Sequence, residues 1–188
     1  MKKLILLLIT LSISSIAAAD KYTIDTKGAH AFVQFKIKHL GYSWLYGRFD
    51  SFSGEFEYSE SDPSQSNIQM TVDTSSVNSN HAARDKHLRG DDFLNVSAHP
   101  TATFSSTSFI EGENGNGTMK GNLTLNGVTK EIDLAVTFIG GGEDPWGGQR
   151  KGYEAVADLK LSEFKIKKSV GGSFEDLTLI VSVEGIKQ

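Results

Sequence analysis

The chain has 188 residues, of which 38% are hydrophobic and 22% are charged, and its formal net charge at pH 7 is −4. This apolar content excludes a disordered protein, and the balance of 19 Lys and Arg against 23 Asp and Glu excludes a strongly basic nucleic-acid-binding protein. The absence of cysteine excludes disulfides, a thiol nucleophile, a cysteine metal site and a lipoprotein anchor.

Residues 1–19 are typical of a secretory signal peptide. A basic pair and an apolar run, broken only by Thr and Ser, are followed by three alanines that end at Ala19. The alternative is an N-terminal membrane anchor, but the run is shorter than the ~20 apolar residues that a spanning helix needs. We therefore expect cleavage between Ala19 and Asp20, which leaves residues 20–188 as a single exported domain.

In the rest of the chain, hydrophobic residues mostly recur with a period of two, which is typical of strands with one buried face. Asn126-Gly127, between two such runs, predicts a type I′ hairpin turn because both turn residues need positive φ angles. An irregular pattern near Ser51 predicts a bulge. Eight strands are expected, over residues 29–39, 46–58, 67–74, 101–109, 117–125, 129–139, 150–161 and 176–186.

One segment departs from this pattern. It begins with the helix start signal Asn80 and ends with the helix stop signal Gly90, so a short helix is expected between strands 3 and 4. A second turn of helix is expected around residues 162–166. The Gly-rich segment 140–148 is expected to be a long flexible loop between two strands.

Eight antiparallel strands with one apolar face each can close into a barrel or stack as a sandwich. The long strands favour a closed, tilted barrel, whose interior has room for one small ligand. The fold predicted is all-β, an eight-stranded antiparallel barrel with a short helix between strands 3 and 4.

Catalytic signatures are mostly absent, since the sequence has no GxSxG, HExxH or GxGxxG motif and no phosphate-binding loop. The histidines do not provide a metal site by local spacing, and a zinc site needs three or four ligands that converge on one point. We therefore predict no metal, no cofactor and no catalytic residues.

The inward side chains of a closed barrel would line a cavity, and an apolar lining implies an apolar ligand. In a sandwich the same side chains would be ordinary core. The predicted lining consists of Val33, Phe35, Ile37, Phe49, Met70, Val72, Phe104, Leu123, Leu134, Val136 and Phe138.

Arg84 and His87 share one face of the short helix through their i, i+3 spacing. The simpler interpretation is a solvated helix surface. The functional hypothesis turns both side chains toward the barrel mouth, together with His39, as donors for the anionic head group of a ligand.

Several motifs, in their order and spacing, resemble the YceI-like proteins. They are DTKGAH at 25–30, FKIKH at 35–39, GRFDSFSG at 47–54, RDKHLR at 84–89, DFL at 92–94, HPTATF at 99–104, GNLTLNGVTK at 121–130, DP at 144–145, Arg150 and SEF at 162–164. The resemblance covers essentially all of residues 21–186. It implies a lipocalin-like barrel with a helix over it, export to the bacterial periplasm, and binding of a polyisoprenoid or another long amphiphile inside the barrel.

The function expected is therefore that of an exported binding protein that holds such a lipid for carriage, storage or stress protection. No enzymatic activity, nucleic-acid partner or stable membrane insertion is expected, and a homodimer is left open. Two alternatives remain. One is a periplasmic enzyme that uses His39, Arg84 and His87 at the barrel mouth, and the other is a structural or stress protein with a filled, ligand-free barrel.

Overall fold

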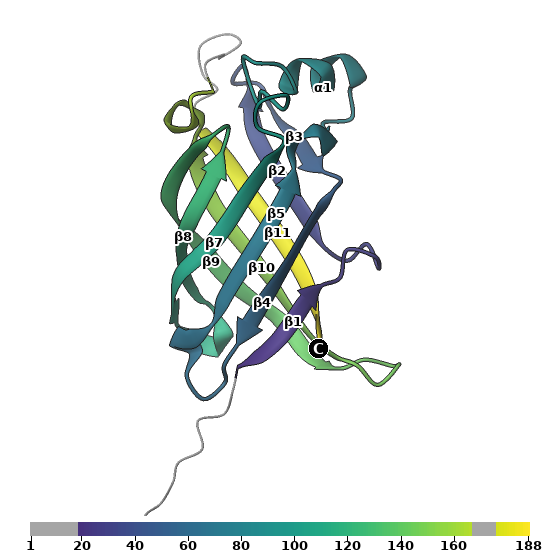
Figure 1. Ribbon diagram of the computed structural model, residues 1–188, viewed down its shortest axis with the longest axis vertical. Helices are drawn as coiled ribbons and strands as arrows, with labels where there is room; N and C mark the ends of the chain where they lie inside the picture. Colours follow the sequence, from purple (N-terminus) through teal and green to yellow (C-terminus); the bar gives the residue numbers. More distant parts are fainter. Residues whose placement is uncertain (1–18, 167–175) are drawn as a thin grey trace, which may run out of the picture.

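The computed structural model describes residues 19–166 and 176–188, and the described part forms a closed antiparallel barrel with one short α-helix (Figure 1). The predicted signal peptide lies outside these residues except for Ala19. Eight strands form the ring, which closes where the first strand pairs with the last. In ring order they are β1 (Asp20–Ile24), β4 (Phe52–Tyr58), β5 (Asn67–Asp73), β7 (Thr101–Glu111), β8 (Gly117–Leu125), β9 (Val128–Glu143), β10 (Gln149–Lys160) and β11 (Asp176–Lys187). The predicted eight-stranded barrel is confirmed.

Three further strands extend the wall, namely β2 (Phe32–His39), β3 (Ser43–Phe49) and β6 (Val77–Asn78). The C-terminal end of β11 pairs with β1, and the N-terminal end of β11 pairs with β2. Strands β1 and β2 therefore lie end to end along the same edge of β11. The single strand expected over residues 46–58 is interrupted at Asp50 and Ser51, where β3 ends before β4 begins. The irregular pattern near Ser51 marks this break.

The short helix α1 (Ala82–Leu88) lies between β6 and β7, as expected. It begins after His81, whose Nδ1 accepts a hydrogen bond from the backbone N–H of Arg84 at 3.2 Å. Asn80 precedes this cap with a φ of 61°. Single 3₁₀ turns occur at η1 (Pro63–Gln65), η2 (Thr74–Ser76), η3 (Glu113–Gly115) and η4 (Leu161–Phe164), and η4 matches the helical turn expected around residues 162–166.

The expectation of a loop over residues 140–148 is wrong for its first half. Strand β9 continues to Glu143, and Gly140 and Gly141 pair with Gly152 and Lys151 of β10. Pairing with an adjacent strand outweighs the weak β-propensity of glycine. The turn that remains, residues 144–148, is closed by backbone N–H groups that donate to Asp144 Oδ1.

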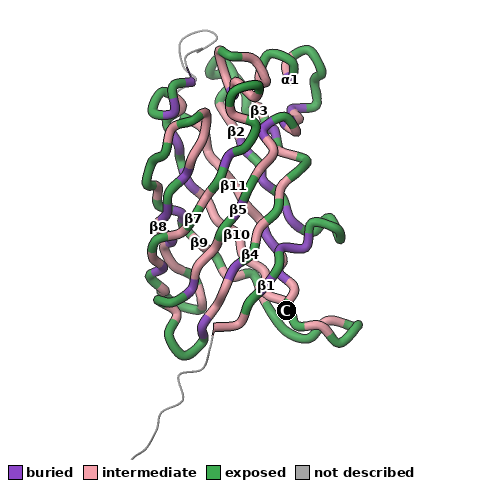
Figure 2. The backbone as a smooth tube through the Cα atoms, viewed as in Figure 1, coloured by how far each residue is buried: buried purple, intermediate pink, exposed green. Residues whose placement is uncertain are grey.

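The two ends of the barrel differ. The helix α1, the β2–β3 turn and the Asn126-Gly127 turn lie at one end, which we call the helix end (Figure 1). The turn at 144–148 and the C-terminus lie at the other end. Buried stretches run along the strands, whereas turns and α1 are mostly exposed (Figure 2). Within the described residues, no helix combines the length and the apolar character needed to cross a membrane.

Several inward phenylalanine rings lie against glycines of nearby strands. Phe35 is paired with Gly47 in the β2–β3 register, and a Cβ atom at Gly47 would overlap the Phe35 ring. The ring of Phe104 covers Gly121 in the same way. Because such a ring occupies the space of a missing side chain, it can lie along the wall and leave the barrel interior open.

Candidate functional site

A cavity of about 790 Å³ lies inside the barrel at the helix end. Its size falls within the ~300–1,000 Å³ typical of small-molecule sites. Strands β2, β3, β5, β6, β7, β8, β10 and β11 contribute to the wall, and α1 with residues 90–94 borders the helix end. Eight of the side chains expected as lining contribute to it: Val33, Phe35, Ile37, Phe49, Met70, Val72, Phe104 and Leu123.

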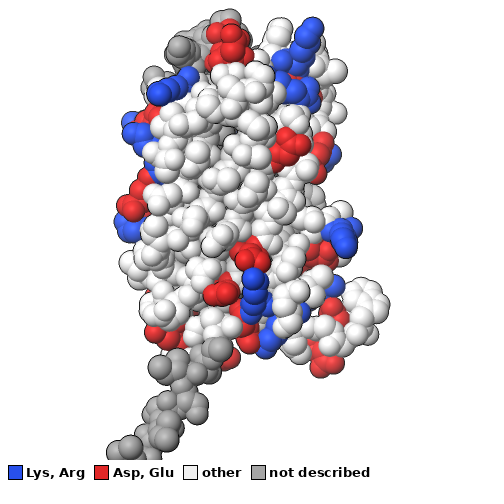
Figure 3. Space-filling model, viewed as in Figure 1, with Lys and Arg blue, Asp and Glu red and all other residues white. Residues whose placement is uncertain are grey.

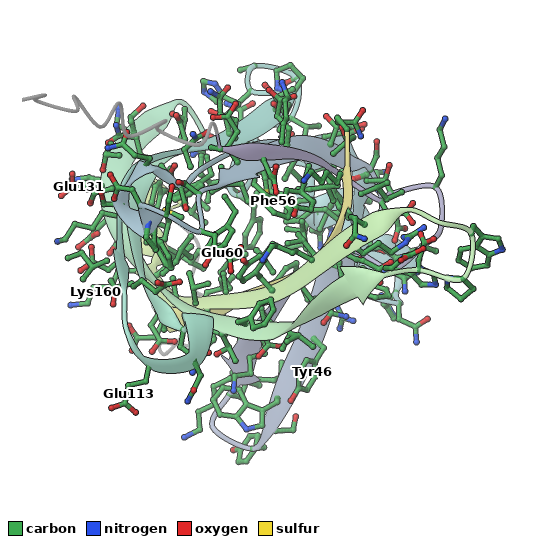
Figure 4. All side chains as sticks on the ribbon, turned by 90° about the horizontal axis from the view of Figure 1, so that it is seen from below. Tyr46, Phe56, Glu60, Glu113, Glu131 and Lys160 are labelled. Carbon is green, nitrogen blue, oxygen red and sulfur yellow. The ribbon has the colours of Figure 1, made fainter. Side chains whose placement is uncertain are left out.

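A second, smaller cavity of about 100 Å³ adjoins the first, and aromatic side chains such as Phe56 and Tyr153 contribute to its lining. Figure 4 shows Phe56 inside the ring of strands. Five side chains contribute to both linings: Met70, Phe104, Leu123, Leu179 and Val181. These five apolar side chains form a layer between the two cavities. A ligand too long for the large cavity would have to pass this layer to reach the smaller cavity.

The remaining predicted lining residues divide between two locations. Leu134 and Val136 line the smaller cavity. The expectation that Phe138 lines the cavity is wrong: its ring packs against Tyr153, with the ring centroids 5.3 Å apart, and it contributes to neither of the two cavity linings. Period-two alternation places all three on one face of β9 but does not indicate where along the barrel the cavities lie.

The polar residues that the sequence suggested lie together at the large cavity. His39, Arg84 and His87 all line it, His39 from β2 and the other two from α1. Lys86, Asp91 and Asp92 also line the cavity, although the sequence analysis did not identify them as candidate site residues. The available signal was their position, because they lie in or directly after the short helix that the sequence predicts.

Hydrogen bonds to the preceding segment hold α1 in place. The carboxylate of Asp85 is buried and accepts hydrogen bonds from the Ser79 backbone N–H at 2.8 Å and from its hydroxyl at 2.5 Å. Burial favours the neutral carboxyl, but the Ser79 hydrogen bonds together with the charges of Arg89 and Arg84 outweigh it and hold the pKa of Asp85 below its usual value. Arg89 also donates to the carbonyl oxygens of Ser75 and Val77. The helix is therefore a fixed border of the cavity.

A second polar cluster occurs where β1, β10 and β11 meet. One potential metal-coordinating atom from each of Asp25, His30 and Glu184 lies within 4.8 Å of the other two, an arrangement that could hold a metal ion. However, Arg150 Nη1 already lies 2.9 Å from Asp25 and 2.5 Å from Glu184, and its Nε lies 2.6 Å from Asp144. The guanidinium compensates the carboxylates, so we interpret the cluster as an ion-pair network that ties the strands together.

The sequence matches the YceI-like domain over residues 22–184. It is 50% identical over 177 residues to Protein YceI of Escherichia coli O17:K52:H18, an alignment that covers 94% of this chain and 92% of that protein.

Solved structures share the fold. Burkholderia cenocepacia BcnA matches with a TM-score of 0.77 at 19% identity, over 86% of this chain and 98% of BcnA. A polyisoprenoid binding domain from Saccharophagus degradans, implicated in plant cell wall breakdown, matches with a TM-score of 0.65 at 16% identity, over 89% of this chain and 98% of that one. With a family match over most of the described barrel and a half-identical relative of nearly the same length, this chain belongs to the YceI-like family.

Proposed function

We propose that the protein is an exported carrier that binds a polyisoprenoid, or a similarly long amphiphilic lipid, inside its barrel. The observation that carries this proposal is the large cavity, whose wall is apolar and whose helix end carries His39, Arg84 and His87. An apolar tube with polar groups at one end suits a ligand that has a long apolar chain and a polar terminus. The structural similarity to a polyisoprenoid binding domain supports this ligand class.

Burial of the chain should supply most of the affinity. Each buried CH₂ group contributes about 0.8 kcal/mol, whereas a hydrogen bond to a charged group contributes about 1.5–3 kcal/mol. Loss of chain entropy reduces the sum. The head group should therefore set the orientation and selectivity of the ligand, and the length of the buried chain should set its affinity.

Export is part of the proposal. Asp20, the first residue after the expected cleavage site, is also the first residue of β1, and its carboxylate lies 2.7 Å from Lys187 Nζ. Cleavage before Asp20 would therefore leave the barrel complete. The intact mass of protein recovered from the bacterial periplasm should correspond to residues 20–188, and recovery of the full 188 residues in the membrane fraction would contradict export.

The two alternatives fit the cavity less well. A ligand-free structural barrel requires a filled interior, which an interior space of about 790 Å³ does not provide. An enzyme would use the polar residues at the mouth, and His39, Arg84 and His87 do border one cavity. However, two donors of Arg84 are already bonded to Ser79, an arrangement that suits a structural and binding role.

The test is mass spectrometry of organic extracts from the purified protein, followed by rebinding of the extracted lipid. We expect a long-chain prenyl lipid in near-stoichiometric amount in the wild type. Leu134→Asp should abolish its recovery, because an unpaired charge would face the apolar interior. Thr137→Asp, on the exposed face of the same strand, is the matched control. Circular dichroism must show that both variants fold.

Two results would overturn the proposal. One is the absence of lipid in wild-type extracts together with no binding of added prenols of any length. The other is undiminished lipid in a folded Leu134→Asp variant, which would place the lipid on the surface of the protein.

A further inference from the structure

The β2–β3 hairpin carries an unusual concentration of exposed aromatic side chains. Of the eight large hydrophobic side chains that are exposed among the described residues, four lie within the seven-residue segment 40–46. Tyr42 is 87% exposed, Tyr46 is 60% exposed and Trp44 is 53% exposed. Exposed apolar residues that occur singly are ordinary, but a contiguous group marks an interaction surface.

These rings share the outer face of the hairpin with two lysines. Lys36 pairs with Tyr46 and Lys38 pairs with Trp44 across the two strands, so all four side chains point to the same side. Lys36 Nζ lies 5.0 Å from the centre of the Trp44 ring. We call this surface, with Tyr42 in the turn, the aromatic–basic face. Figure 4 shows Tyr46 outside the ring of strands, on the side away from the interior.

The opposite face of the same two strands borders the large cavity. Ile37, His39 and Leu45 alternate with the residues of the aromatic–basic face and contribute to the cavity lining. A molecule that binds the outer face of this hairpin would therefore lie one strand thickness from the cavity, at the helix end (Figure 1). The polar lining residues His39, Arg84 and His87 belong to this cavity.

The charge of the hairpin is opposite to that of the whole protein. The chain has a net charge of −4, yet residues 32–49 contain no Asp or Glu and carry Lys36 and Lys38, besides Arg48, which pairs with Asp50 just beyond the hairpin at 2.6 Å. On the face that Figure 3 shows, acidic and basic side chains are both present, mostly toward the ends and edges of the barrel. The hairpin thus combines cations without acids and exposed Trp and Tyr rings, the residue types enriched where proteins meet the lipid head-group layer.

We propose that the aromatic–basic face docks peripherally on an anionic lipid bilayer and thereby brings the cavity mouth to the membrane that supplies or receives the ligand. This inference rests on the proposed lipid-binding function, because a carrier of long-chain lipids must exchange its ligand with a bilayer. The rings enter the head-group layer and the lysines meet lipid phosphates, each lysine increasing partitioning about five-fold.

Charge favours a bilayer over a second copy of the chain as the occupant. In a two-fold symmetric dimer this face would meet itself. Lys36 and Lys38 of one copy would then approach the same lysines of the other copy, with no acidic residue in the hairpin to compensate them. An anionic lipid surface provides the missing negative charge.

The two tryptophans provide an internal comparison. Trp44 belongs to the aromatic–basic face, whereas Trp146 is 82% exposed in the turn at the other end of the barrel. The protein would be prepared as Trp146→Phe, which keeps Trp44, and as Trp44→Phe, which keeps Trp146. Each would be mixed with vesicles of phosphatidylethanolamine and phosphatidylglycerol with brominated acyl chains. We expect quenching and a blue shift for Trp44 only, both lost at high salt or with phosphatidylcholine alone.

Charge reversal tests the lysines. Lys36→Glu combined with Lys38→Glu should reduce vesicle binding in sedimentation by ten-fold or more, because two attractions become repulsions. Lys130→Glu combined with Lys160→Glu makes the same change in net charge at two exposed positions of β9 and β10 and should retain binding. Binding of a short, water-soluble prenol without vesicles should be unchanged in both, which separates docking from ligand binding.

The outcomes distinguish docking from lipid binding. Docking is refuted by absent vesicle binding, by equal quenching of Trp44 and Trp146, or by full binding of the hairpin double variant. It is also refuted if sedimentation shows a homodimer that shields Trp44 in solution. If the protein docks on vesicles but binds no prenol, the docking proposal stands and the carrier function is refuted. If it binds prenol but does not dock, the carrier function stands and the docking proposal is refuted.

Discussion

Ser79 accepts two hydrogen bonds from the guanidinium of Arg84, from Nε to its hydroxyl oxygen at 2.7 Å and from Nη2 to its carbonyl oxygen at 2.5 Å. The same Ser79 hydroxyl donates to the buried carboxylate of Asp85. Arg84 therefore stabilises the start of α1 at the same time as it borders the large cavity. Its contribution to the fold and its predicted contact with a ligand head group need separate measurements.

We predict that Arg84→Ala weakens the binding of a prenyl phosphate more than the binding of the matching prenol. The difference should be at most about 1.5–3 kcal/mol, the usual contribution of a hydrogen bond to a charged group. Calorimetric titration of both ligands into wild type and variant gives this difference directly. Ser79→Ala serves as the control, because it loosens α1 but retains the guanidinium, so it should lower stability without discriminating between the ligands. An equal loss for both ligands in Arg84→Ala would mean that Arg84 acts only through the fold.

A second prediction concerns the apolar layer between the two cavities. Leu123 is buried and lines both, so Leu123→Trp should obstruct the passage from one to the other. Long prenols should lose about ten-fold or more in affinity, equivalent to ~1.4 kcal/mol, while prenols short enough for the large cavity should change little.

The control for this variant is Ile139→Trp, which adds the same indole at a position that is 65% exposed on β9. A series of prenols of increasing length, titrated against both variants, gives the dependence of affinity on chain length. Equal affinity of Leu123→Trp for all lengths would show that the chain does not pass this layer.

Most strands could be predicted because period-two alternation depends only on local sequence. Leu134 and Val136 share a face as expected, and Asn126-Gly127 adopts the positive φ angles, 47° and 70°, that a type I′ turn requires. Strand β1 was missed because it has only five residues and follows the expected cleavage site directly. Strand β6 has two residues, too few for any pattern.

The site could be predicted only in part, because closure of the barrel decides which residues meet. The sequence identified the inward faces but not the division into two cavities, which depends on how the side chains of several strands pack. The Arg150 network is the clearest example, since Asp25 and Arg150 are separated by 125 positions and meet through the pairing of β1, β11 and β10. No local spacing indicates such a contact.

The Arg150 network leads to a prediction about pH. A backbone hydrogen bond from Gly28 and the adjacent guanidinium hold the pKa of Asp25 below its usual value, and Arg150 and Gly148 do the same for Asp144. Because these folded-state pKa values are depressed, the stabilisation is complete above the ordinary carboxyl pKa of about 4. It is lost as the pH falls through the folded-state values.

Arg150→Gln should therefore lower the thermal midpoint most at pH 7, and its difference from wild type should shrink progressively below about pH 4. Thermal unfolding followed by circular dichroism between pH 2 and pH 7 measures this difference. Lys120→Gln, which removes an exposed ion pair with Asp133, should change the midpoint little at any pH. A difference for Arg150→Gln that is independent of pH would show that the carboxylates are not responsible.

The last prediction tests whether the glycines keep the barrel interior open. Gly47→Ala should destabilise the protein by about 1–3 kcal/mol, because the added methyl group overlaps the Phe35 ring and the packed wall must adjust. Gly47 does not have a positive φ angle, so backbone strain does not contribute. In a Phe35→Leu background the overlap is absent, and Gly47→Ala should be close to neutral.

A double-mutant cycle on Gly47 and Phe35, measured by urea unfolding, isolates this overlap as a coupling energy. Gly140→Ala is the control, since nothing lies within 4 Å of a Cβ atom at that position. If the methyl group displaces the Phe35 ring into the cavity, Gly47→Ala should also reduce prenol binding, and Phe35→Leu should restore it in the double variant. A stability loss without any loss of binding would mean that the ring moves along the wall, and that the glycine serves packing alone.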